Sequence, residues 1–151
     1  MIRDDIKAAV IAAMKSGDKD KVGTLRMAQA AIKNRDIELR TASAQPEDDA
    51  LVTEVLQKMI KQRRESADLY RKGGRDDRAE AEEAEIAIIA HYLPAQLSDD
   101  EARAKIQAII ADLGASSMKD MGRVMAAVKK SLGSAIEPAR ASALVKGLLA
   151  G

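Results

Sequence analysis

Residues 92–101 have the sequence Tyr-Leu-Pro-Ala-Gln-Leu-Ser-Asp-Asp-Glu, which ends one predicted helix and begins another. Pro94 stops the first helix, because proline lacks a backbone N–H and clashes with the preceding turn. Ser98 and Glu101 have the spacing of a capping box, in which the hydroxyl accepts from the third helical amide and the glutamate reaches back to the cap. We therefore expect a helical N-terminal domain, 1–95, and a small C-terminal domain, 96–151.

Upstream of this boundary, apolar residues recur at the helical period, and the sustained alternation typical of strands is lacking. The predicted helices cover residues 2–15, from 18 or 20 to 40, 46–72 and 76–93. Pro46 is expected in the first turn of the third helix, where a missing N–H costs nothing. Gly73-Gly74 is a very short link between the predicted helices 46–72 and 76–93, so these two helices should form a long antiparallel hairpin.

The two helices of this hairpin carry opposite charges. Interhelical ion pairs are therefore expected between the basic side chains of one helix and the acidic side chains of the other. The basic set is Lys61, Arg63, Arg64, Arg71 and Lys72, and the acidic set is Glu80, Glu82, Glu83 and Glu85.

Downstream of the boundary, three short helices are predicted. The first ends at Gly114, the second runs over 118–132 with Ser117 as its cap and stops at Gly133, and the third begins at Pro138. The whole chain is thus expected to be all-α, with a long helix hairpin followed by a compact three-helix domain.

The amino-acid composition excludes several classes of functional site. The 151 residues include 25 Lys and Arg against 24 Asp and Glu, two Tyr, and no Phe, Trp or Cys. Disulfides, thiolate metal sites and cysteine nucleophiles are excluded, and stacking platforms for unstacked bases are lacking. The acidic start at Asp4 and Asp5 is unlike a signal peptide, and no apolar run approaches the roughly 20 residues that span a bilayer. A soluble cytoplasmic protein without membrane partners is expected.

No combination of residue types makes an active site. Ser116 and Lys119 have the Ser-x-x-Lys spacing of some acyl-enzymes, but the accompanying motifs are lacking, and helix capping explains the serines. His91 is the one histidine, at a predicted helix C-terminus that favours its cation. Gly73-Gly74 is not followed by the Gly-Lys-Ser/Thr of a phosphate loop. We expect no catalytic residue, no cofactor and no metal.

One charge asymmetry stands out in the last helices. Residues 118–146 hold six Lys and Arg against two Asp and Glu, a net charge of +4. The cations are Lys119, Arg123, Lys129, Lys130, Arg140 and Lys146. Lys119, Arg123 and Lys130 share one helix face by their spacing. Two interpretations stay open: an ordinary solvated face, which periodicity alone favours, and a stripe that binds RNA phosphates without reading bases.

Several short segments follow one another in a characteristic order. They are Leu25-Arg26-Met27, Gly74-Arg75-Asp76-Asp77, Ala84-Glu85-Ile86, Tyr92-Leu93-Pro94-Ala95-Gln96-Leu97-Ser98, Gly114-Ala115-Ser116-Ser117 and Asp120-Met121-Gly122-Arg123-Val124-Met125. In this order and spacing the chain resembles the GatB/YqeY family over nearly its whole length. The resemblance implies a helical N-terminal region followed by a three-helix YqeY-type domain.

That domain is similar to the tail of the B subunit of the tRNA-dependent amidotransferase, where it contacts the outer body of tRNA. The resemblance implies a non-catalytic accessory protein in translation that binds tRNA through phosphate contacts, or binds an aminoacyl-tRNA-handling enzyme. Its family-level label is carbon–nitrogen ligase with glutamine as amido-N-donor, although the chemistry lies in other domains of the amidotransferase. The alternative is a protein-interaction or self-association module acting through the long hairpin.

The resemblance also assigns structural positions, which are Tyr92, Pro94, Gly122, Met125 and Gly133. It implies that Gly122 is a close-packing point where a backbone or phosphate can approach. The loop 133–138 lacks the basic residue and Asp-Gly pair common in the family. The expected tRNA contacts therefore move to Lys119, Arg123, Lys129 and Lys130.

Overall fold

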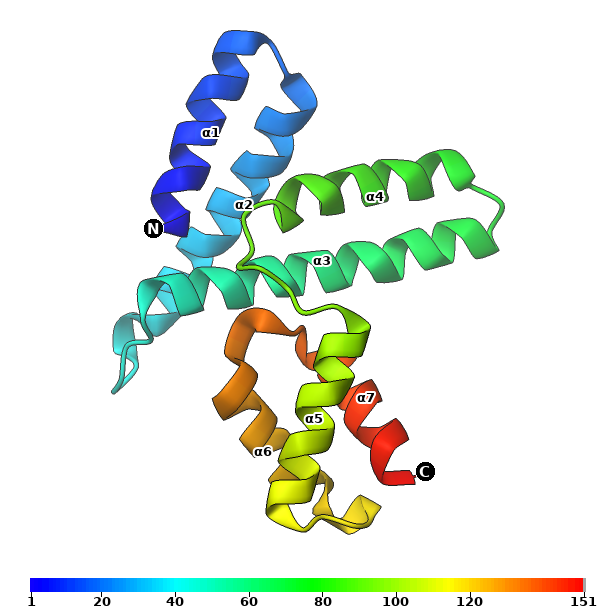
Figure 1. The fold of residues 1–151 in the computed structure, drawn as a ribbon. Coiled ribbons are helices and arrows are strands. Elements are labelled where there is room, and N and C mark those ends of the chain that lie inside the picture. Colours follow the sequence, from blue (N-terminus) through cyan, green and yellow to red (C-terminus); the bar gives the residue numbers. More distant parts are fainter. Residues whose placement is uncertain (151) are drawn as a thin grey trace. The chain divides into compact units, whose positions relative to one another are not determined.

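The computed structural model describes residues 1–150, and within them it contains seven α-helices and no strand (Figure 1). The all-α prediction is confirmed. The chain divides into two compact units, of which the first is Met1–Leu93 and the second begins at Pro94. None of the described helices is both long enough and apolar enough to cross a membrane.

The first unit contains four of the helices. They are α1 (Ile2–Ser16), α2 (Lys19–Glu38), α3 (Asp48–Lys72) and α4 (Asp76–Ala90), with a 3₁₀ turn at Leu39–Thr41 after α2. Gly17 ends α1 with φ at 76°, a left-handed conformation that glycine adopts without strain. Asp18 then begins α2, because its Oδ1 accepts from the Lys21 amide at 3.1 Å. One glycine and one aspartate therefore make the sharp reversal between the first two helices.

Two predicted helix ends in this unit were wrong. Pro46 lies before α3, and Glu47 is the N-cap, with its Oε1 accepting from the Asp49 amide at 3.3 Å. Helix α4 ends at Ala90 instead of 93. The residue before a proline disfavours the helical region, and Tyr92 and Leu93 pack against the hydrophobic core from the turn that follows α4.

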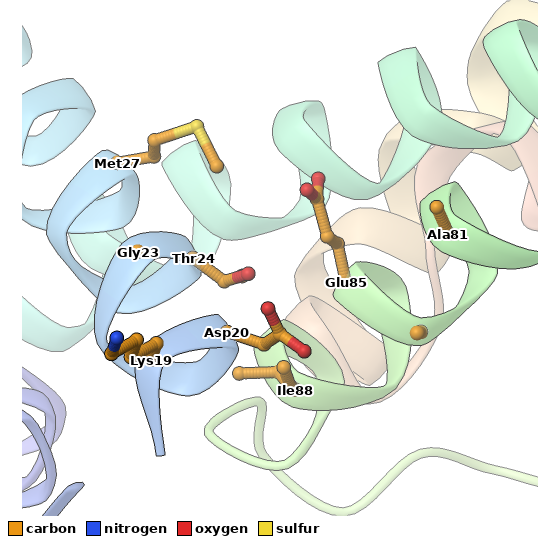
Figure 2. Close-up of a pocket in the computed structure, with 9 residues that line it drawn as sticks. Lys19, Asp20, Gly23, Thr24, Met27, Ala81, Glu85 and Ile88 are labelled. Atoms are coloured by element: carbon orange, nitrogen blue, oxygen red, sulfur yellow. The ribbon is translucent and has the colours of Figure 1, made fainter. Parts of the chain in front are cut away.

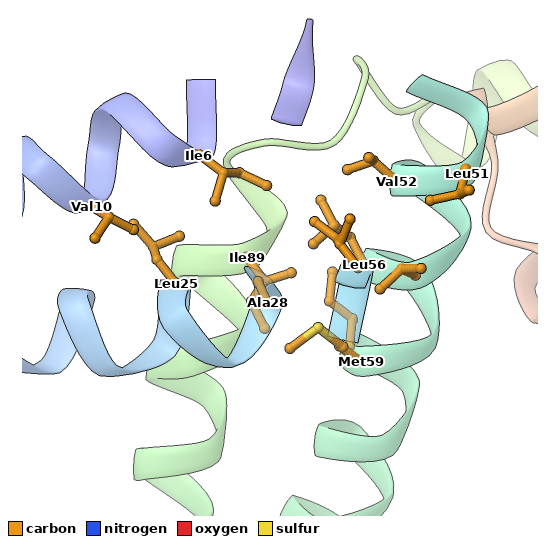
Figure 3. Close-up of a cluster of buried hydrophobic side chains, with 12 residues drawn as sticks. Ile6, Val10, Leu25, Ala28, Leu51, Val52, Leu56, Met59 and Ile89 are labelled. Atoms are coloured by element: carbon orange, nitrogen blue, oxygen red, sulfur yellow. The ribbon is translucent and has the colours of Figure 1, made fainter. Parts of the chain in front are cut away.

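The core of the first unit draws on all four helices. Ile6, Leu25, Leu56 and Ile89, one from each helix, are at most 1% exposed, and Figure 3 shows how they lie in the cluster. Helices α3 and α4 lie antiparallel, side by side, as the short Gly73-Gly74 link predicted (Figure 1). This packing holds α2 against both α3 and α4.

Two of the predicted ion pairs join α3 to α4. Arg63 Nε lies 2.8 Å from Glu85 Oε2, and Arg71 Nη2 lies 2.7 Å from Glu83 Oε1. The expectation that these oppositely charged faces pair across the hairpin is confirmed for these residues.

The second unit is a bundle of three helices that contact one another. They are α5 (Asp99–Leu113), α6 (Met121–Leu132) and α7 (Pro138–Ala150), with 3₁₀ turns at Met118–Asp120 and Gly133–Ala135. Its core includes Ile106, Val124, Val128 and Val145, which are at most 1% exposed. Pro138 begins α7 as predicted.

The starts of α5 and α6 are capped in different ways. Ser98 Oγ accepts from the Glu101 amide at 3.2 Å and itself donates to Glu101 Oε1 at 2.9 Å, so the predicted cap is present and the glutamate reaches the hydroxyl. Helix α6 begins three residues later than predicted. Asp120 Oδ2 accepts from the amides of Ser116 and Ser117 at 3.0 and 3.3 Å, and this carboxylate holds the chain in the preceding 3₁₀ turn.

The segment after Pro94 is tied into the second unit. Gln96 Nε2 donates to the Ser134 carbonyl oxygen at 2.8 Å, and the Leu97 amide donates to that of Ala135 at 2.8 Å. These bonds satisfy polar groups of a stretch that has no regular secondary structure. They explain why the second unit already includes the residues from Pro94 onward, ahead of the start of α5.

Candidate nucleic-acid interface

Helix α6 presents its cations away from the core of the second unit. Val124 and Val128 are buried on the inner face, whereas Arg123, Lys129 and Lys130 are exposed. Lys119 is exposed in the turn that leads into the helix. Because residues four or seven apart share a helix face, Arg123 and Lys130 lie on one side of α6. The predicted stripe is thus accessible to a large ligand.

Arg123 is oriented by Asp120. Its Nη2 lies 3.1 Å from Asp120 Oδ1, and the arginine side chain is 52% exposed. The hydrogen bonds from the amides of Ser116 and Ser117 hold the pKa of Asp120 below its usual value, so the aspartate remains charged at neutral pH. Asp120 therefore holds the Arg123 guanidinium in place and neutralises part of its positive charge.

The lysines of the set differ from Arg123 in having no such partner. Lys119, Lys129, Lys130 and Lys146 are exposed, and no ion pair joins any of them to another described residue. An exposed ammonium without a protein partner keeps its full charge for an incoming anion. Most of the net charge of the stripe is thus carried by lysines.

Arg140 is the exception among the predicted contacts. Its Nε lies 2.9 Å from Asp99 Oδ1, and its Nη2 donates to the Leu97 carbonyl oxygen. Only 30% of the side chain is exposed. Arg140 joins α7 to the start of α5, and we therefore leave it out of the candidate interface.

Gly122 and Gly133, two of the positions that the family resemblance marks as structural, have different roles. A Cβ added at Gly122 would meet no atom within 4 Å, so no part of the described chain packs closely against it, and the approach of a phosphate there stays a prediction. The missing side chain leaves open surface beside Arg123. Gly133 ends α6 with φ 52° and ψ −128°, a conformation that side-chain-bearing residues rarely adopt. Met125 is half-buried and packs against the core.

Tyr92 and Pro94 have structural positions at the end of the first unit and the start of the second. The Tyr92 ring meets His91 edge to face with 5.1 Å between ring centroids, and burial raises the pKa of its hydroxyl. His91 is exposed. Among residues 1–150, no group of three or more His, Asp or Glu side chains is placed to hold a metal ion.

Sequence reasoning missed a hollow in the first unit, which lies between α2 and α4 (Figure 2). Asp20, Thr24 and Glu85 contribute polar atoms to its lining. Glu85 is 61 positions from Thr24 and 65 from Asp20, and no local pattern signals that it lies near them.

Together these observations define an all-helical protein whose second unit is a small three-helix bundle with an exposed cationic helix face. The family model described as Yqey-like protein matches residues 3–149, and the chain belongs to this family. The resemblance inferred from the motifs is thereby confirmed.

Several relatives of this chain are fungal proteins. The protein named Altered inheritance of mitochondria protein 41, mitochondrial, is 33% identical in Eremothecium gossypii over 114 residues, which cover 74% of this chain and 58% of the relative. Its counterpart in Lachancea thermotolerans is 33% identical over 119 residues, or 77% of this chain and 59% of the relative. An uncharacterized protein of Schizosaccharomyces pombe is 34% identical over 95 residues, or 62% of this chain and 73% of that protein. The chain thus matches less than two thirds of the length of the first two relatives.

The prediction of a cytoplasmic protein was wrong. It rested on the acidic start of the chain and on its lack of a long apolar run. The relatives in Eremothecium gossypii, Lachancea thermotolerans and Vanderwaltozyma polyspora are all named as mitochondrial proteins. The features of the N-terminal residues therefore do not establish a compartment.

Proposed function

We propose that this protein is a non-catalytic accessory factor that binds folded tRNA through its second unit. The observation that carries the proposal is the exposed face of α6 and its preceding turn, where Lys119 and Lys130 have no ion-pair partner among the described residues. A cationic face of this kind recognises phosphates and the shape of the RNA backbone. Amide-transfer chemistry is not part of the proposal.

The binding mode follows from the side chains available. Both tyrosines of the chain, Tyr70 and Tyr92, belong to the first unit, so the second unit has no aromatic ring on which a base could stack. Lysine and arginine contacts to phosphate need no unstacked base. The open surface at Gly122 lets an RNA backbone come close to Arg123.

The test is a fluorescence titration of labelled tRNA with the full chain at several salt concentrations. Each neutralised phosphate should contribute about 0.7–0.9 to the slope of log K against log salt. The double variant Lys119→Gln with Lys130→Gln should weaken binding and lower that slope by about 1.4–1.8. Neutral replacement is preferable to charge reversal, because a glutamate near the C-terminal end of α6 would also oppose the helix dipole.

Lys105→Gln is the matched control. Lys105 is an exposed lysine of the same unit, but it lies on α5. It should leave the slope unchanged if binding is local to the α6 face. Dissociation constants weaker than about 10⁻⁴ M at physiological salt, or equal losses for the control and the double variant, would refute the proposal.

A second candidate function is protein interaction through the α3–α4 hairpin. Leu69 is 68% exposed near the end of α3, and beside it Arg78 lies over the Tyr70 ring at 5.9 Å. Leu69 is the residue of the hairpin that such an interaction would bury. Light scattering of the full chain tests self-association: a mass above the monomer that Leu69→Gln abolishes supports it, and a monomeric mass at high concentration argues against it.

A further inference from the structure

The hollow between α2 and α4 is an open groove whose volume is large enough for a small ligand. Its volume is about 310 Å³, and its walls come only from the first unit. The residues that line it are Lys19, Asp20, Gly23, Thr24, Met27, Ala81, Ala84, Glu85 and Ile88. Pockets of about 300 Å³ or more accommodate small organic ligands.

The Thr24 hydroxyl is the most informative group in this hollow. Thr24 is only 3% exposed, yet its hydroxyl has no hydrogen-bond partner among the residues that the structure describes. Figure 2 shows its oxygen turned from α2 toward the space before α4. The hydroxyl keeps some exposure to the hollow, so it can donate to or accept from a ligand atom that enters there.

Two carboxylates lie on opposite walls of the same hollow. Asp20 extends from α2 beside Thr24 and makes no ion pair with any described residue, while Glu85 rises from α4 (Figure 2). Glu85 Oε2 accepts from Arg63 Nε at 2.8 Å, which leaves Oε1 without a bond to the described part of the chain. The Lys19 ammonium turns away from this group in Figure 2. Because Arg63 pairs with Glu85, the Asp20 carboxylate is the unpaired charge that the hollow offers to a cation.

The remaining walls are apolar or small. Met27 and Ile88 offer hydrocarbon and sulfur surface, and Gly23, Ala81 and Ala84 leave room between the helices. An inorganic cation gains nothing from such walls, whereas a carbon stem does. The lining thus suits a ligand with a positive, hydrogen-bond-donating head and a slender hydrocarbon body.

We propose that this pocket binds a primary alkylammonium group, with its N–H donors on Asp20 and Thr24 and its carbon stem against Ile88. The site lies in the first unit and is independent of the proposed RNA-binding face. The ammonium can belong to a free amine or to a lysine side chain of another chain, since both present the same head on the same stem.

The experiment is a titration of the full, ¹⁵N-labelled chain followed by two-dimensional NMR. The probes are n-butylamine, 1,4-diaminobutane and Nα-acetyl-lysine methylamide, with 1-butanol as the uncharged control. Saturable shifts centred on the Gly23 and Thr24 amides are expected for the amines and not for the alcohol. Tighter binding of the diamine would indicate a free amine as the ligand, and tighter binding of the lysine derivative would indicate a protein side chain.

Two substitutions test the assigned contacts. Asp20→Asn should weaken amine binding about tenfold, because a charge-assisted hydrogen bond is lost, whereas Asp4→Asn in the first turn of α1 should not. Thr24→Val keeps the shape of the side chain and should weaken binding about fivefold with little change in the midpoint of thermal unfolding, since no described residue loses a hydrogen bond. A threonine with a purely structural role would show a loss of stability and no change in binding.

Gly23 allows the pocket to be closed without disturbing the core. A Cβ at Gly23 meets no atom within 4 Å, so Gly23→Leu should fold and fill the hollow, and Gly23→Ala is its matched control. Loss of amine binding in Gly23→Leu but not in Gly23→Ala supports the proposal. The proposal is overturned if no saturable shift occurs at tens of millimolar amine, if the alcohol binds equally well, or if Asp20→Asn and Thr24→Val bind like the unaltered chain.

Discussion

Arg3 joins three helices of the first unit, and its removal should weaken that unit in a pH-dependent way. Its Nη1 and Nη2 lie 2.8 and 3.0 Å from the two carboxylate oxygens of Asp36 on α2. The same Nη2 lies 2.8 Å from Asp48 Oδ1 at the start of α3. The perturbation is Arg3→Met, which keeps the length of the aliphatic stem and removes the charge.

The expected loss follows from these contacts and their exposure. Hydrogen bonds to charged groups contribute about 1.5–3 kcal/mol when buried, and exposed ion pairs contribute about 0–1 kcal/mol. The side chains of Arg3, Asp36 and Asp48 are 36%, 39% and 30% exposed, so solvent screens them substantially. We expect Arg3→Met to lower the free energy of unfolding of the first unit by about 1–2 kcal/mol at neutral pH. Arg35→Met, which loses pairs with the more exposed Glu38 and Glu54, should cost less than Arg3→Met, below about 1 kcal/mol.

The pH dependence has a definite sign. The hydrogen bond from Arg3 holds the pKa of Asp36 below its usual value. A carboxyl whose pKa is lower in the folded state stabilises the fold above its unfolded pKa of about 3.9, and this stabilisation is lost as the pH falls through the folded pKa. The difference between Arg3→Met and the unaltered chain should therefore shrink in acid.

Tyrosine fluorescence provides the assay, because both tyrosines lie in the first unit and report on its unfolding alone. For a unit of this size, about 1 kcal/mol corresponds to about 4–8 °C in Tm. A double-mutant cycle of Arg3→Met with Asp36→Asn isolates the coupling between the two side chains. A coupling of zero, or a loss that is the same at neutral pH and in acid, would refute this reasoning.

Two further predictions concern backbone conformation and core packing. Gly133→Ala should destabilise the second unit by about 1–3 kcal/mol because φ is 52° there, and circular dichroism melts should show it, whereas Gly122→Ala should be neutral or stabilising. Equal effects at the two glycines would contradict the conformational argument. Ile89→Ala should cost about 2–5 kcal/mol by urea denaturation, since this fully buried side chain lies in the core cluster of the first unit. A cost below about 1 kcal/mol would mean that the cluster collapses around the lost atoms.

Local signals predicted most of the helix boundaries. Gly17 and Asp18 mark the turn between α1 and α2, and Ser98 with Glu101 marks the start of α5, because the capping atoms are only a few residues from the amides that they satisfy. The errors arose where distant residues intervene. Helix α4 ends early at Ala90, and Tyr92 and Leu93, in the turn that follows, pack against the core.

In the candidate sites, too, features within one helix were predictable and contacts between distant residues were not. The exposed face of α6 was predictable, because residues within one helix have a known angular spacing and Val124 and Val128 define the inner side. The engagement of Arg140 by Asp99 was not, because these residues are 41 positions apart. A long side chain reaches whichever carboxylate the packing of α5 and α7 brings near it.

The linear order of residues was sufficient for the helical class, the hairpin between α3 and α4, and the family, since capping, helical periodicity and motif order are all properties of neighbouring positions. The hollow that brings Asp20, Thr24 and Glu85 together depends on how α2 packs on α4. The same is true of which cations keep their charge for a ligand and which, like Arg140, pair within the fold. Such properties depend on distances between helices, and these arise from the packing of whole side-chain layers, which no local stretch of sequence encodes.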